Sequence, residues 1–318
     1  MFTLLPMAVR FAVVSTAFVI FASIVLIDAP VVHAIGFTLG QFDTYGLLIN
    51  DGTHNGDINT APVNANIGIG LITGSVNLHN EVVNGKVDCA GNCATAVSGG
   101  AITGTQPVSR GGTPPLGSPA SLNSNVAAVE TAITTAKSLS TTFGAESGSG
   151  TPVTINGTTT INASAGFLDG SGTRVFTASS FSIGNGNTVT INGTAAQFVV
   201  IDITGNSNNK LDGALALTGG ITPDQVLINF LGSGNEVGGA ANGATLQGTF
   251  LIPNQKVNLN SLTINGHLFG GAEGQDFQFV SNSFISQPPI SQVPEPASLL
   301  LLGSGLVGLA YWRRRKTE

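Results

Sequence analysis

The acidic side chains are the first candidates for chemistry in this 318-residue chain. Asp169 and Asp202 could form a carboxylate pair of the kind that polysaccharide-cleaving enzymes use. Between residues 35 and 296, however, the chain has no tryptophan and a single tyrosine, Tyr45, so platforms for stacking sugar rings are scarce. We therefore predict that the protein is not an enzyme. A glycan-acting enzyme is an alternative, which an Asp→Asn change at either position would test.

Metal ligands and cofactor motifs are the next possibility. Three histidines are widely separated in sequence, without metal-binding spacing: His54, His79 and His267. Three aspartates lie near Gly/Asn-rich turns, where carboxylate and carbonyl oxygens could bind Ca²⁺: Asp43, Asp51 and Asp57. Because the sequence contains no EF-hand or Ca²⁺-binding nonapeptide repeat, we interpret them as solvated loop residues. Nucleotide-binding and hydrolase motifs are also missing, so the sequence predicts neither a metal nor a cofactor.

The C-terminal residues carry a pattern with a clear physical role. Pro294, Glu295 and Pro296 form a short rigid motif, and residues 297–312 after it contain no charge. As a helix this apolar segment would be about 24 Å long, slightly shorter than the ~30 Å hydrocarbon core of a bilayer. Four basic residues follow it and should stay cytoplasmic: Arg313, Arg314, Arg315 and Lys316. The pattern predicts a transmembrane helix followed by a basic stop.

This order of motif, apolar helix and basic cluster resembles the PEP-CTERM sorting signal of Gram-negative bacteria, over residues 293–318. The resemblance implies recognition by an exosortase-like protease, which would cut near the Pro-Glu-Pro motif. The protein would pass through the inner membrane and then reach the cell surface or the extracellular matrix. An ordinary C-terminal membrane anchor is the alternative.

The other end of the chain also indicates export. Residues 11–27 are almost wholly apolar, and Val32 and Ala34 are small enough for the −3 and −1 positions of a signal-peptidase site. We predict that residues 1–34 are a signal peptide and that the mature chain begins near Ile35. A retained N-terminal anchor is the alternative.

The two cysteines of the chain, Cys89 and Cys93, are separated by three residues, one of them a glycine. Exported proteins enter an oxidising compartment, where a local disulfide is the default state of such a pair. We predict a Cys89–Cys93 disulfide, with free thiols as the alternative.

The body between residues 35 and 296 is acidic and poor in charge. It contains six basic and fifteen acidic side chains, and therefore has a net charge of −9. This excess of negative charge argues against binding to nucleic acid. Glycine, asparagine, threonine, serine and alanine dominate, so hydroxyl and amide groups must supply the polarity of its surface.

Short runs of alternating apolar and polar residues recur along the body and end at Asn-Gly or Asp-Gly. Alternation with a period of two predicts strands with one buried face, and Asn-Gly accepts positive φ at a turn. Examples are residues 45–52, 82–85, 153–157, 188–193 and 262–266. Antiparallel hairpins in a sandwich or barrel and parallel coils in a β-solenoid could both use such units.

Three longer apolar runs favour the solenoid. Residues 197–203, 225–230 and 248–253 have the composition of central parallel strands that are covered on both faces. A helix that lies against one face would supply such a cover.

One segment has a helical period instead. Ser118-Pro119 has the form of an N-cap followed by proline at the first helical position. Apolar residues follow at spacings of three and four: Leu122, Val126, Val129, Ile133, Ala136, Leu139 and Phe143. Gly144 ends the pattern. The spacing predicts an amphipathic helix at about 119–142, packed along the flank of the β body.

The end of the body resembles the closing coils of the bacterial ice-binding-like and choice-of-anchor A families. After the strand at 226–230, a Gly248-Thr249 step opens an apolar strand, Pro253 begins a turn, and Asn265-Gly266 opens the next apolar strand. The resemblance implies a mainly β fold, a right-handed discontinuous β-solenoid with one long helix alongside. We expect this solenoid to span residues 35–285, with a linker at 286–292 before the tail.

For ice-binding members the resemblance also implies a flat face that binds ice, which requires a surface array of matched spacing. The threonines here are scattered in sequence and form no sustained Thr-x-Thr ladder: Thr158, Thr159, Thr160, Thr188, Thr190 and Thr263. We therefore predict a non-enzymatic exported protein with a structural or adhesive role and exopolysaccharide as a partner. An ice-binding protein is the first alternative.

Overall fold

The computed structural model describes residues 37–60, 63–79, 83, 86–91, 97–98, 123–206 and 209–286. They belong to one compact unit, 34–292, of the two into which the chain divides. The predicted signal peptide, the linker beyond Ser286 and the sorting tail lie outside the described residues. Within the described ranges, no helix is both long and apolar enough to cross a membrane.

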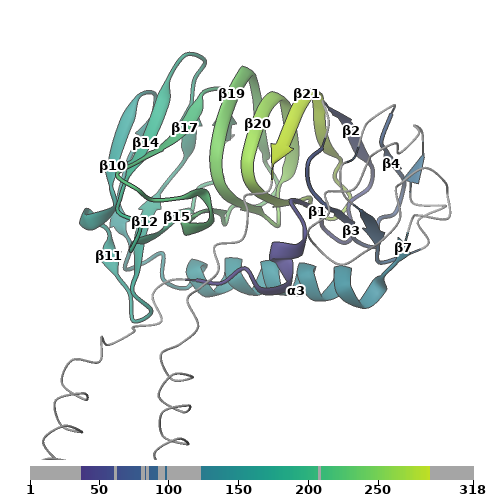
Figure 1. Cartoon of the computed structure of the whole chain (residues 1–318), viewed down its shortest axis with the longest axis horizontal. Helices are drawn as coiled ribbons and strands as arrows, with labels where there is room; N and C mark the ends of the chain where they lie inside the picture. The colour runs from purple at the N-terminus through teal and green to yellow at the C-terminus, as the bar shows by residue number, and fades with distance from the viewer. Residues whose placement is uncertain are drawn as a thin grey trace, which may run out of the picture. The chain divides into compact units, whose positions relative to one another are not determined.

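The body is a solenoid of parallel strands, which confirms the predicted mainly β class (Figure 1). Each coil places one strand in each of three stacks of parallel strands. In two neighbouring coils, β12 (Thr173–Ala178) pairs with β15 (Phe198–Ile203), β13 (Phe181–Ile183) with β16 (Asn209–Leu211), and β14 (Thr188–Asn192) with β17 (Ala214–Thr218). The antiparallel alternative is therefore wrong for the body. An antiparallel pair does occur at one end, where β11 (Phe167–Leu168) lies beside β12. The right-handed sense of the coils stays a prediction.

The long strands β19 (Glu236–Ile252), β20 (Lys256–Gly270) and β21 (Phe277–Ser286) turn corners and join more than one stack. We call the stack that contains β12 and β15 the helix-side stack, because the long helix packs against it. It also contains these strands: β1 (Leu47–Ile49), β3 (Ile67–Ile69), β5 (Val87–Cys89), β7 (Asn123–Ser124), β8 (Thr151–Pro152) and β18 (Val226–Phe230). The groove stack contains β2 (Gly56–Thr60), β4 (Val76–Asn77), β6 (Val97–Ser98), β9 (Ile155–Asn156), β13 (Phe181–Ile183) and β16 (Asn209–Leu211). The threonine stack contains β10 (Thr159–Asn162), β14 (Thr188–Asn192) and β17 (Ala214–Thr218).

The order of coils along the axis is discontinuous, as the resemblance implied. Leu47 of β1 stacks on Leu268 of β20, and Gly56 of β2 stacks on Phe277 of β21. We call these two pairings the seam. The described part of the body thus starts in the middle of the solenoid with β1 and builds the N-terminal coils outward. It then returns along helix α3 (Val126–Gly144) and starts again at the far end (Figure 1).

The helix is shorter at its start than the sequence predicted. Helix α3 spans Val126–Gly144, not 119–142, because Asn123 and Ser124 pair in parallel with Asp88 and Cys89. That pairing satisfies backbone groups in the sheet, which a local Ser-Pro signal cannot foresee. The predicted stop at Gly144 is confirmed, and residues 118–122 lie outside the described ranges.

Two apolar cores result from this arrangement. The first fills the solenoid, where inward residues of all three stacks meet, and the second lies between α3 and the helix-side stack. Val129, Ile133 and Ala136 of α3 are buried in the second core, as the amphipathic pattern predicted. The 3₁₀ helix η1 (Gly40–Thr44) covers its edge with Phe42, whose ring is fully buried. Two other 3₁₀ turns, η3 (Ala163–Ala165) and η4 (Pro223–Gln225), form corners.

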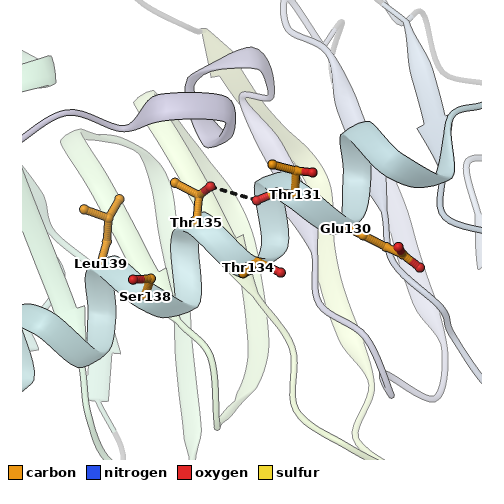
Figure 2. Close-up of a pocket in the computed structure, with 6 residues that line it drawn as sticks. All are labelled: Glu130, Thr131, Thr134, Thr135, Ser138 and Leu139. Carbon is orange, nitrogen blue, oxygen red and sulfur yellow. Dashed lines mark hydrogen bonds between the residues drawn. The ribbon is translucent and has the colours of Figure 1, made fainter.

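The outer side of α3 carries a hollow of about 540 Å³ (Figure 2). Among the described residues, its lining comes from this one helix: Glu130, Thr131, Thr134, Thr135, Ser138 and Leu139. The Thr135 hydroxyl donates to the Thr131 carbonyl at 2.8 Å, and Thr131 donates to the Ala127 carbonyl at 2.6 Å. Two of its hydroxyls are therefore already used within the helix.

Candidate functional site

The outward side of the threonine stack is a regular polar array, which we call the threonine face. The register places Thr160 beside Thr190, Thr190 beside Ala216, and Thr245 beside Thr263. Its nine members form two columns: Thr160, Thr190, Ala216, Gln247 and Asn265 in one, and Thr188, Ala214, Thr245 and Thr263 in the other. The residues between them, such as Val189 and Ile191, are buried in the solenoid core.

Hydrogen bonds between amides and hydroxyls fix the borders of this face. Asn192 donates from Nδ2 to Asn162 Oδ1 at 3.2 Å, and Thr218 donates from Oγ1 to Asn192 Oδ1 at 3.2 Å. On the opposite border Thr158 donates from Oγ1 to Asn187 Oδ1 at 3.1 Å. Side chains held in this way lose little rotamer freedom when they bind a surface.

The threonine face combines regular spacing with the absence of charge. Neighbouring strands lie about 4.8 Å apart, and alternate residues of one strand lie about 6.7 Å apart. None of the nine members is ionisable. Such a lattice of hydroxyl, methyl and amide groups fits a repeating, uncharged surface better than a single small molecule. The structure thus brings together Thr160, Thr188, Thr190 and Thr263, which the sequence showed as scattered, although Ala214 and Ala216 interrupt the columns.

Of the predicted carboxylate pair, Asp202 lies in a buried polar cluster beneath α3. Its side chain has no exposed area, and its Oδ1 accepts from Asn229 Nδ2 at 2.7 Å. Asn229 in turn accepts from Ser140 Oγ at 2.6 Å and donates to the Ser140 carbonyl at 3.0 Å. The pKa of Asp202 is raised to about 7, mainly because burial disfavours the charged carboxylate; the Asn229 hydrogen bond lowers it in part, and the nearby charge of Glu146 adds a smaller rise.

Asp169 lies in the turn between β11 and β12. Its Oδ1 accepts from the backbone N–H of Ser171 at 2.9 Å and of Thr173 at 2.7 Å. Burial raises the pKa of Glu146, and the charge of Asp169 and a hydrogen bond with it raise that pKa further. Glu146, which the sequence argument missed, therefore interacts with both predicted acids. A fully buried Asp202 cannot contact a glycan, so this cluster lacks the geometry of a catalytic pair.

The Ser140–Asn229 contact gives a test of this cluster. We expect Ser140→Ala to lower the free energy of unfolding by about 1–3 kcal/mol, because it leaves the buried Asn229 Oδ1 without a donor. Thr134→Ala, on the exposed side of the same helix, should change it by less than about 0.5 kcal/mol. Urea unfolding of both variants measures the difference, and equal losses would contradict the expected role of the contact.

The three histidines named in the sequence analysis each lie beside an acid of another coil or turn, and of the three aspartates interpreted as loop residues, Asp57 lies in β2 and Asp43 in η1. His54 lies 3.1 Å from Asp276, and His79 lies 2.7 Å from Asp57. His267 is buried, with Nδ1 2.9 Å from the Tyr45 carbonyl oxygen and Nε2 3.4 Å from Asp43 Oδ1. Asp51 accepts from the Leu71 N–H at 2.8 Å. Within the described ranges, no three His, Cys, Asp or Glu side chains converge as a metal site would require.

The remaining predicted site residues fall largely outside the described ranges. Cys89 is buried at the end of β5, in register with Ile69, whereas Cys93 is not among the described residues. The disulfide between them therefore stays a prediction. The Pro-Glu-Pro motif and the basic residues after position 312 also lie beyond the last described strand.

Comparison with solved structures relates this fold to ice-binding proteins. One from the Antarctic ascomycete Antarctomyces psychrotrophicus is 15% identical, covers 80% of this chain and 100% of its own, and has a TM-score of 0.48. One from an Antarctic Flavobacteriaceae bacterium is 12% identical, covers 80% of this chain and 48% of its own, and has a TM-score of 0.52. The Shewanella frigidimarina ice-binding protein domain is 12% identical, with coverages of 80% and 99% and a TM-score of 0.47. At these identities the likeness concerns the fold alone.

Comparison with family models is more informative. Among curated proteins no sequence matches the chain significantly. The PEP-CTERM protein-sorting motif matches residues 292–316, which confirms the resemblance of the tail. The ice-binding-like adhesive domain matches residues 34–273, about three quarters of the chain. The chain therefore belongs to the ice-binding-like adhesive domain family and carries a PEP-CTERM sorting motif at its C-terminal end.

Proposed function

We propose that the protein is a non-enzymatic adhesin, exported and displayed at the surface of a Gram-negative cell, with the threonine face as its contact surface. The family match and the sorting motif support an adhesive role and sorting to the surface. The observation that carries the proposal is the in-register, uncharged array of Thr160, Thr190 and their neighbours on one side of the solenoid. An array of this kind contacts a repeating surface over a large area without any charged partner.

The two ends of the chain would deliver this body. Signal peptidase would cut after Ala34, and the segment at 297–312 would hold an intermediate in the inner membrane. An exosortase-type protease would then cut near Pro294–Pro296 and release the protein to the surface or matrix. Intact mass of the protein recovered outside the cells tests this step. A chain that still ends at Glu318 in the inner membrane would instead indicate a permanent anchor.

A charged, bulky side chain in the middle of the threonine face should disrupt adhesion. We expect Thr190→Arg to reduce attachment of cells that display the full chain at least tenfold, because it breaks the flat contact and buries an unpaired charge. Thr134→Arg on the outer side of α3 is the matched control and should attach normally. Attachment to surfaces coated with matrix of the producing strain measures the effect, and equal attachment of both variants would contradict it.

Ice binding is the second candidate, and the threonine columns favour it specifically. Their hydroxyl and methyl groups repeat in two directions, which is what ordering a layer of water against a surface requires. Thermal hysteresis and ice-crystal shaping by the wild type, both lost in Thr190→Arg, would support this candidate. Adhesion without thermal hysteresis would support the adhesin proposal and contradict ice binding.

A further inference from the structure

The groove stack carries a polar groove of about 300 Å³ that the proposed function does not use. Its floor follows β19, where Gly238 and Ala240 present little or no side chain. Strands β16 and β20 form the walls, since Lys210 and Asn258 flank Gly238 on either side in register. Asp212 and Asn260 continue the two walls. Three strands therefore build the groove, in contrast to the hollow on α3.

Hydrogen bonds fix several of the polar groups in this groove. Asp212 accepts from the Ala240 N–H through Oδ1 at 2.8 Å. Glu236, at one end, accepts from Asn258 Nδ2 through Oε1 at 3.1 Å and lies 3.2 Å from Lys256 Nζ through Oε2. The groove is thus preorganised, which lowers the entropy cost of binding a ligand.

We propose that this groove binds one sugar unit of a neutral, hydroxyl-rich polysaccharide. Sugar hydroxyls both donate and accept hydrogen bonds, and the groove offers the Lys210 ammonium as donor and the Asp212 and Glu236 carboxylates as acceptors. Its volume lies at the lower end of the range for small-molecule sites, which suits a single unit. The body's net charge of −9 disfavours an acidic glycan.

The groove lies on the groove stack, whereas the threonine face lies on the threonine stack. The proposal rests on the proposed function only for surface display, which would bring matrix glycans to the groove. Gly238 offers a direct test of it. A Cβ atom there would lie 2.6 Å from Glu236 Oε1, so Gly238→Ala fills the floor and displaces the carboxylate. Because that oxygen is the end of a flexible side chain, the solenoid should tolerate the change.

Affinity electrophoresis of the full chain, kept in a detergent without a sugar headgroup, tests the groove. The gels contain dextran, glucomannan, xyloglucan or alginate. We expect at least one neutral glycan to retard the wild type more than alginate does, with at least fivefold weaker binding in Gly238→Ala and Lys210→Ala. Gly148→Ala, where an added Cβ meets nothing within 4 Å, and Thr190→Arg should bind like the wild type.

Several outcomes would overturn the assignment. These are no retardation by any of the three neutral glycans, stronger retardation by alginate, or unchanged binding in both groove variants. Loss of binding in Thr190→Arg alone would assign the glycan to the threonine face. Thermal melts followed by circular dichroism check folding, and if Gly238→Ala does not fold, Lys210→Ala decides. The attachment assay tests the adhesin proposal separately. If cells that display the protein fail to attach, while glycan retardation still depends on the groove residues, the adhesin proposal is wrong and the groove assignment holds.

Discussion

Replacing Asp202 by asparagine should stabilise the protein above pH 7 and flatten the pH dependence of its stability. The folded-state pKa of this fully buried carboxyl is about 7, against an ordinary value of 3.8. Well below pH 3.8 the carboxyl is protonated in both the folded and the unfolded state, and its contribution to stability is complete. As the pH rises through 7 that contribution is lost, because the unfolded chain ionises freely and the folded chain does not.

The expected size of this effect is on the order of 4 kcal/mol between pH 4 and pH 8. In the Asp202→Asn variant the carbonyl oxygen of the new amide can still accept from Asn229 Nδ2, so the substitution removes the charge and keeps that hydrogen bond. Urea unfolding at pH 4 and pH 8 should show similar stability at the lower pH and a more stable variant at the higher pH. Glu130→Gln, an exposed change on α3, is the control. A variant less stable than the wild type at pH 8 would contradict the expectation.

Removing the Phe42 ring should cost about 3–5 kcal/mol of stability. The ring is fully buried, with its centroid 5.5 Å from that of His267 and 6.2 Å from that of Phe269. It attaches η1 to the helix-side stack, so Phe42→Ala opens a cavity and weakens that attachment. Phe167→Ala is the matched control, because 42% of this residue is already exposed. Denaturant midpoints of the two variants measure the contrast, and similar losses would mean that η1 contributes little to the core.

The local patterns of the sequence predicted the elements of this fold well. The apolar runs became β15, β18 and the end of β19, all covered on both faces as their composition indicated. The three-and-four spacing placed Val129, Ile133 and Ala136 correctly on the buried side of α3. These features depend on residues close together in the chain, and periodicity reports them directly.

Features that depend on distant residues could not be predicted in this way. The helix start was wrong because β5 competes for Asn123 and Ser124. The threonine columns were missed because the coils differ in length: Thr160 and Thr190 are 30 residues apart, and Thr245 and Thr263 only 18. No fixed period joins such positions. The link from Glu146 to both predicted acids likewise depends on how the end of α3 meets the β11–β12 turn.

The seam has a consequence for how the protein reaches its native state. In a continuous solenoid each coil can form on the one before it, so folding can follow the growing chain. Here β1 cannot pair with β20 until β20 has been synthesised, because Leu47 stacks on Leu268, more than 200 residues later in the chain. Contacts of such long range form slowly. The seam can therefore close only after nearly the whole body has been synthesised, whereas the pairings of β12 with β15 and of β15 with β18 need only neighbouring coils.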